Sequence, residues 1–95
     1  MREDDVAMIR RHVKISGRVQ GVFFRDACQR KATEIGVAGW VRNAPDGTVE
    51  AIFEGEPGVI EAMCDWCCSG PEQARVEHID ITDEEPQGDT SFQVR

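Results

Sequence analysis

The sequence predicts one small α+β domain in which two helices cover one face of an antiparallel sheet. The chain has 95 residues, which is too short for two separate cores. Its apolar residues recur with the period of a strand in some segments and with the period of a helix in others. Glycine and proline lie where these segments meet, as expected of turns and helix ends.

The N-terminal part of the chain is predicted to form a polar extension followed by a strand. Residues 1–9, which include four charged residues, are predicted to form a polar extension of little structure, and the predicted domain spans residues 10–95. Val13 and Ile15 alternate with polar neighbours, which is typical of a half-exposed strand, and that strand is expected to stop at Gly17.

A helical period begins at Phe24 and continues through Cys28, Ala32 and Ile35. Gly36 follows directly and is expected to form the C-cap of this helix, because glycine readily adopts the left-handed backbone conformation that ends helices. The residues before Phe24 therefore form a loop between the first strand and the first helix.

The rest of the chain is predicted to form a hairpin, a second helix and two further strands. Strands over 37–43 and 48–54 flank Asp46-Gly47, which is a strong hairpin signal. The remaining predicted elements are a helix over 57–68, a strand over 75–81, an acidic solvated loop over 83–89 and a short strand over 91–94. The resulting β-α-β-β-α-β order, with a short extra C-terminal strand, is that of ferredoxin-like folds.

The composition excludes several classes of function. Eleven Lys and Arg against eighteen Asp and Glu give a net charge of −7, which opposes sequence-independent binding to nucleic acid or to anionic membranes. No apolar run approaches the roughly 18 to 20 residues of a membrane helix, and the charged N-terminus does not resemble a signal peptide. We therefore expect a soluble cytoplasmic protein, and a monomer because no interface signal is evident.

The four cysteines, Cys28, Cys64, Cys67 and Cys68, are expected to be free thiols, because disulfide frameworks accompany secretory signals. Cys64 and Cys67 form a CxxC, which is the one spacing in the chain that suggests a redox or metal site. Helical spacing explains these two residues better: together with Ile60 and Met63 they form an apolar stripe, in which a buried cysteine acts as a small hydrophobe.

The loop before the first helix has the features of an anion site. Gly17 and Gly21 allow the backbone to curl so that successive N–H groups point at one anion, and the helix N-terminus adds its own donors and positive dipole. Arg25, in the first helical turn, could bind phosphate or carboxylate oxygens through two parallel hydrogen bonds. The alternative is a tight turn with a surface arginine, which the glycine spacing alone does not exclude.

Asn43 is a second candidate, at the predicted end of a strand. In a ferredoxin-like arrangement this strand end and the glycine loop can lie close together, so Asn43 could hold a water against a bound anion. The alternative is an asparagine that simply tolerates unusual backbone angles beside the Pro45-Asp46-Gly47 turn.

These segments resemble the acylphosphatase family. The run Gly17-Arg18-Val19-Gln20-Gly21-Val22-Phe23-Phe24-Arg25 is similar to the phosphate-loop signature of the family, and Gly36-Val37-Ala38-Gly39-Trp40-Val41-Arg42-Asn43 to its second block. Asp46-Gly47, Val49-Glu50, Gly55 and the closing Phe92-Gln93-Val94-Arg95 continue the resemblance, which covers about residues 10–95. Two positions depart from the pattern: Ala44 follows the asparagine, and Phe23 is bulky at a variable position.

The resemblance implies hydrolysis of acyl phosphates to carboxylate and inorganic phosphate, without metal or cofactor. It implies that Arg25 binds the phosphoryl group, that Asn43 orients the attacking water, and that the backbone of the Gly17–Phe23 loop cradles the phosphate. Acylphosphatase-like domains also occur within larger carbamoyl-handling maturation proteins, but the length of this chain favours the standalone enzyme.

Other functions remain as alternatives. The first is a non-catalytic phosphate or small-anion sensor that uses the same loop. An RNA-binding module is disfavoured by the net charge, and a metal carrier is disfavoured because the CxxC lies on the second helix rather than in the loop after the first strand. His12 and His78 are interpreted as strand residues without a catalytic partner, Asp26 as a first-turn acid and Asp46 as a turn residue.

Overall fold

The computed structural model describes residues 7–95, and residues 1–6 of the predicted extension lie outside the described residues. The elements follow the predicted order: β1 (Ile9–Arg18), α1 (Phe24–Ile35), β2 (Ala38–Asn43), β3 (Val49–Gly55), α2 (Pro57–Ser69), β4 (Arg75–Glu84) and β5 (Phe92–Val94). The ferredoxin-like α+β fold is thus confirmed, and most boundaries agree with the sequence to within one or two residues.

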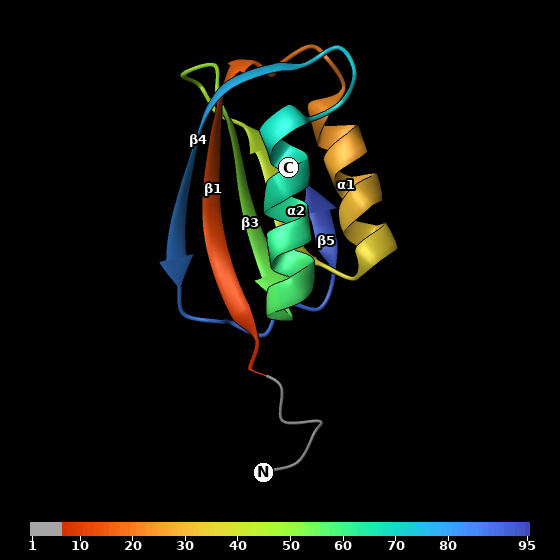
Figure 1. Ribbon diagram of the computed structural model, residues 1–95, viewed down its shortest axis with the longest axis vertical. Coiled ribbons are helices and arrows are strands. Elements are labelled where there is room, and N and C mark those ends of the chain that lie inside the picture. Colours follow the sequence, from red (N-terminus) through yellow and green to blue (C-terminus); the bar gives the residue numbers. More distant parts are fainter. Residues whose placement is uncertain (1–6) are drawn as a thin grey trace.

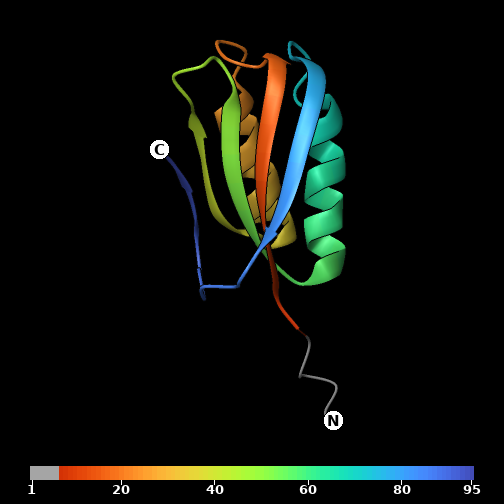
Figure 2. The same cartoon turned by 90° about the vertical axis from the view of Figure 1, so that its left-hand side faces the viewer.

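The five strands form one sheet in the order β4-β1-β3-β2-β5. The first four strands pair antiparallel, as predicted. The short strand β5 pairs parallel with β2, so the complete sheet is mixed. Both helices pack on one face of this sheet, and the other face is open (Figures 1 and 2).

The core lies between the sheet and the two helices. Alternating residues of β1 point into it, with Val13 and Ile15 fully buried. Phe24 on α1 packs edge-on against Trp66 of α2, with ring centroids 5.5 Å apart. Burying each large apolar side chain stabilises the fold by about 1.5–3 kcal/mol, so this layer holds the start of α1 firmly in place.

The cysteine-containing stripe of α2 faces the core, as predicted. Ile60, Met63, Cys64 and Cys67 are the buried residues of this helix. All four cysteines of the chain are free thiols, and Cys68 alone among them is exposed. Burial raises the pKa of the Cys64 thiol, which disfavours the reactive thiolate.

The acidic segment over 83–89 is exposed to solvent from residue 83 to residue 88, as predicted, but it also contacts a buried ion pair that was not predicted. Strand β4 continues to Glu84, and the loop that follows closes over the buried pair Arg10 and Glu54. Arg10 contacts Glu54 at 2.9 Å and Asp89 at 2.8 Å. The carboxylate of Glu54 also accepts hydrogen bonds from the backbone N–H groups of residues 87–89. Because Arg10 is distant in sequence from this loop, the charge pattern alone could not predict the network.

No helix within residues 7–95 is long and apolar enough to cross a membrane.

Candidate active site

The loop between β1 and α1 begins where β1 leaves the sheet. Pairing with β4 shifts register between Ser16 and Gly17, and Gly17 has a φ of 124°. A side chain at Gly17 would place its Cβ 2.2 Å from the backbone oxygen of Arg75. Position 17 therefore requires glycine because the backbone of β4 passes close by. The sequence-based prediction gave a different reason for this glycine, namely the curl of the loop.

Two valines anchor the loop in the core. The side chains of Val19 and Val22 are only 1% and 2% exposed. Among the backbone hydrogen bonds formed by loop residues within 7–95, none is donated by the N–H groups of residues 19–23. The loop thus has a fixed path and backbone donors that the fold itself does not use.

The side chain of Gln20 connects the loop to the β2–β3 turn. Its Nε2 donates to the backbone oxygens of Ala44 and Thr48, each at 2.8 Å. Ala44 immediately follows Asn43, so this amide holds the loop and the end of β2 in a fixed relation. Sequence reasoning placed Gln20 in the phosphate loop without predicting this bridging contact.

Helix α1 starts at the loop with Phe23 as its N-cap residue. Phe23 has the left-handed backbone angles φ 64° and ψ 26°, and no side chain caps the helix. The first N–H groups of α1 are consequently free of a side-chain acceptor, and the positive end of the helix dipole lies at the loop.

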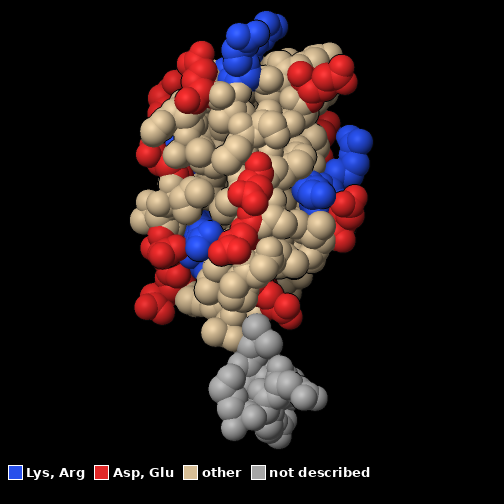
Figure 3. Space-filling view, in the orientation of Figure 1, with Lys and Arg blue, Asp and Glu red and all other residues tan. Residues whose placement is uncertain are grey.

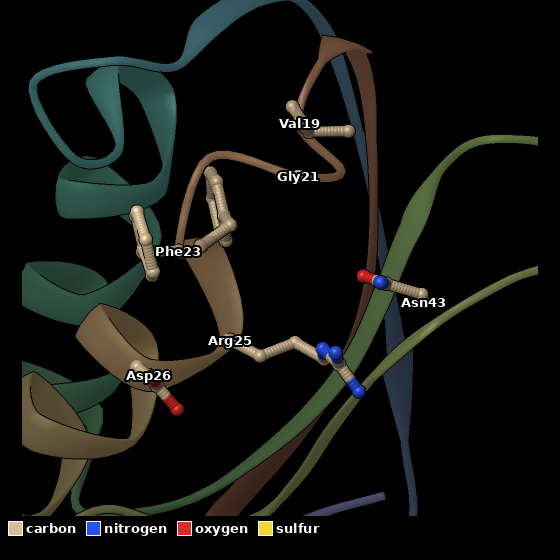
Figure 4. Close-up of a pocket in the computed structure, with 7 residues that line it drawn as sticks. Val19, Gly21, Phe23, Arg25, Asp26 and Asn43 are labelled. Carbon is tan, nitrogen blue, oxygen red and sulfur yellow. The ribbon is translucent and has the colours of Figure 1, made fainter.

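A pocket of about 320 Å³ joins the loop, the start of α1 and the end of β2. Its lining residues are Val19, Gly21, Phe23, Phe24, Arg25, Asp26 and Asn43. Figure 4 shows the Arg25 and Asn43 side chains reaching toward one another from α1 and β2. The structure therefore places the two side chains singled out from the sequence in one pocket with the glycine loop.

Three other residues of the predicted phosphate loop, Arg18, Gln20 and Val22, do not line the pocket. Arg18 is exposed and pairs with Arg75 in the sheet. The side chain of Gln20 is bonded to the β2–β3 turn, and the side chain of Val22 is buried in the core. Only the backbone of these two residues can therefore reach the pocket.

The chain's last residue contacts Arg25. Nη1 of Arg25 donates to the backbone oxygen of Arg95 at 3.2 Å. The guanidinium of Arg95 lies 4.7 Å from the ring centre of Trp40, and the backbone N–H of Arg95 donates to the backbone oxygen of Val41 at 2.8 Å. Sequence reasoning gave Arg95 no role, because the contact depends on the parallel pairing of β5 with β2.

Of the other titratable residues considered from the sequence, Asp26 lines the pocket, whereas the two histidines and Asp46 are not among its lining residues. His12 contacts Glu50 on the open face of the sheet, and this contact, together with Arg42, holds the pKa of Glu50 below its usual range. Asp46 accepts hydrogen bonds from Thr48 and Lys14, which lower the pKa of its carboxyl group. His78 pairs with its neighbour Asp80. Within residues 7–95 no group of three or more His, Cys, Asp or Glu side chains is arranged to hold a metal ion.

A comparison with protein-family models matches residues 11–94 to the model described as Acylphosphatase. The chain belongs to the acylphosphatase family. The match includes the loop, Arg25 and Asn43, and it confirms the resemblance deduced from the two sequence blocks.

Individual acylphosphatases agree with this assignment. The protein named Acylphosphatase from Roseiflexus sp. (strain RS-1) is 56% identical over 82 residues, which are 86% of this chain and 88% of the relative. The solved acylphosphatase of Coxiella burnetii superimposes with a TM-score of 0.89 at 38% identity, covering 93% of both chains.

A larger protein contains a similar domain. The crystal structure of full-length HypF in its phosphate- and nucleotide-bound form matches with a TM-score of 0.90 at 26% identity. That match covers 99% of this chain and 12% of HypF. The acylphosphatase fold therefore occurs both in small proteins and as a part of a much longer one.

Proposed function

We propose that this acylphosphatase-family enzyme hydrolyses acyl phosphates by attack of a water on phosphorus, with the phosphoryl group held by the 17–23 loop and Arg25. The observation that carries the proposal is the common pocket of the loop, Arg25 and Asn43. Acyl phosphate hydrolysis itself follows from family membership.

The phosphoryl group is bound by charge and by backbone donors. The N–H groups of residues 19–23 and the N-terminus of α1 supply donors directed at an anion. Arg25 supplies a planar guanidinium that can bind two phosphate oxygens at once. Charge on the three equatorial oxygens of the transition state is stabilised by the same groups.

Asn43 orients the nucleophile. Its side-chain amide has both a donor and an acceptor, so it can accept a hydrogen bond from a water and fix the direction of the water's lone pair. Asn43 ends β2 and faces Arg25 (Figure 4). A water held there lies beside the phosphorus of a substrate bound by Arg25, which lowers the entropic cost of attack.

The bond changes need no strong acid or base from the protein. The water oxygen forms a bond to phosphorus, the bond from phosphorus to the acyl oxygen breaks, and the carboxylate leaves with the electron pair. The proton of the water passes to a phosphate oxygen, giving inorganic phosphate. A carboxylate is a stable leaving group, so positioning and charge stabilisation suffice, and we propose that the reaction is independent of metal ions.

Hydrolysis of benzoyl phosphate with excess EDTA, with inorganic phosphate as a competitor, tests the proposal. The expected result is turnover that survives chelation and is competitively inhibited by phosphate. Folded protein that binds phosphate but gives no turnover would instead identify a non-catalytic anion sensor.

We also propose that the protein acts as a monomer in the cytoplasm. The net charge of −7 supports the monomer, because like-charged copies repel one another. Light scattering after size exclusion is expected to give the mass of one chain, and cell fractionation to recover the protein with soluble markers.

A further inference from the structure

Phe23 is exposed although its side chain is large and apolar. The residue is 71% exposed, more than any other large hydrophobic residue within 7–95. Its ring therefore contributes little to the core, and packing does not explain why phenylalanine occupies this position.

The backbone of Phe23 is also strained. With a φ of 64°, it is the one non-glycine residue in the left-handed region among residues 7–95. A bulky side chain is unfavourable in that conformation, and such outliers gather at functional sites. The geometry of the loop explains the backbone angle, but glycine would adopt that angle without strain. A function of the aromatic ring would account for its presence.

The pocket places this ring on the side where the acyl group must leave. In attack in line with the breaking bond, the water and the leaving oxygen lie on opposite sides of phosphorus. Asn43 holds the water in the proposed mechanism, and Figure 4 shows Asn43 and Phe23 at opposite sides of the pocket, with Arg25 between them. The acyl group of a bound substrate is thus directed toward Phe23 and the solvent.

We propose that Phe23 is a specificity-determining residue that binds the acyl group of the substrate, and that it favours acyl phosphates with aromatic or large apolar acyl groups. The exposed ring offers such a group an apolar face, which it does not offer to a small acyl group such as acetyl. This inference rests on the proposed function, because it assumes that the phosphoryl group occupies the loop.

The test compares kcat/KM for benzoyl phosphate with kcat/KM for acetyl phosphate in wild type and in Phe23→Gly. Glycine keeps the backbone N–H and relieves the strain, so the melting temperature is expected to be unchanged or higher. The benzoyl-to-acetyl ratio of kcat/KM is expected to fall by about threefold to tenfold, the range typical of one lost aromatic contact.

Three further variants make the result specific. Phe23→Tyr retains an aromatic face and is expected to keep the wild-type ratio, whereas Phe23→Leu gives an intermediate ratio. Ile81→Ala removes another exposed apolar side chain, one on β4 that does not line the pocket, and is expected to leave the ratio unchanged.

The outcomes separate this inference from the proposed function. A ratio that stays at the wild-type value in Phe23→Gly overturns the role of Phe23 while leaving acyl phosphate hydrolysis intact. If wild-type protein hydrolyses neither substrate, the proposed function fails, and the inference fails with it.

Discussion

At the scale of single residues, the proposed site combines the 17–23 loop with two polar side chains on two different elements. Arg25 lies in the first turn of α1, and Asn43 is the last residue of β2. Neither position is demanded by the core, because both side chains are partly exposed. Substitutions here are therefore expected to change activity much more than stability.

Replacing Arg25 tests whether a forked guanidinium is needed. Arg25→Ala is expected to abolish turnover, and Arg25→Lys is expected not to restore it, because lysine has a point charge and cannot form two parallel hydrogen bonds. Steady-state kinetics with benzoyl phosphate measure this, and circular dichroism checks the fold. Activity near the wild-type level in either variant would remove Arg25 from the proposed role.

Replacing Asn43 tests the positioning of the water. Asn43→Ala is expected to lower kcat by about 100-fold, the effect typical of losing one preorganised polar group in a transition state. The inhibition constant of inorganic phosphate is expected to change much less, since Asn43 is proposed to contact the water and not the phosphoryl group. A kcat within about twofold of wild type would mean that another group orients the nucleophile.

At the scale of elements, the site depends on the relation between the loop and the β2–β3 turn. Gln20 fixes this relation through its two 2.8 Å hydrogen bonds to the turn. Each such bond contributes about 1 kcal/mol. We therefore propose that Gln20 is a positioning residue, which would act on catalysis through the location of Asn43.

A double-mutant cycle tests the role of Gln20. Gln20→Leu is expected to lower kcat about tenfold, but to lower it little further when Asn43→Ala is already present. An equal loss in both backgrounds would contradict action through Asn43. Gln29→Leu is the matched control, because Gln29 on α1 also donates from its amide to a backbone oxygen, that of Phe92.

Local sequence patterns predicted most of these elements. The helix from Phe24 to Gly36 follows from apolar periodicity and a glycine cap, and the Gly36 N–H indeed donates to the oxygen of Ala32. Local patterns alone do not predict that Asn43 lies beside the loop. The two segments meet only because β1 and β2 flank β3 in the folded sheet. The contact of Gln20 with the turn joins residues more than 20 positions apart, and no local pattern encodes it.

At the scale of the whole molecule, charge is distributed differently inside and outside. On the face shown in Figure 3, basic side chains are scattered among acidic ones and form no continuous basic patch on the described part of the chain. Inside, Arg10 and Glu54 are 6% and 3% exposed and link β1, β3 and the loop after β4. That loop is exposed to solvent, as predicted, but its contacts with Arg10 and Glu54 join distant segments that no local charge pattern brings together.

Removing one partner of this pair is expected to destabilise the fold. Glu54→Ala is expected to lower the free energy of unfolding by about 3 kcal/mol, because Arg10 then loses its most buried partner. Asp83→Ala is the control: Asp83 is 85% exposed in its pair with Arg11, so the expected change is below about 1 kcal/mol. Urea denaturation of both variants measures the difference, and equal losses would contradict the importance of burial.

The same pair is expected to make stability depend on pH. Burial by itself would raise the pKa of Glu54, but hydrogen bonds from the Gln87 N–H, Arg10 and the Gly88 N–H outweigh it and hold the pKa below its usual range. A lowered pKa contributes stability above the unfolded value, which is lost as the pH falls through the folded value. The difference in unfolding free energy between wild type and Glu54→Gln is therefore expected to shrink from pH 7 to about pH 3. A constant difference would contradict the linkage.

The proposed mechanism depends on attack of water at phosphorus in the pocket formed by the loop, Arg25 and Asn43. Hydrolysis of benzoyl phosphate in ¹⁸O-labelled water, followed by mass spectrometry of both products, tests this most directly. We predict that the label enters inorganic phosphate and is absent from benzoate. Label in benzoate would show attack at the acyl carbon and would contradict the proposed mechanism.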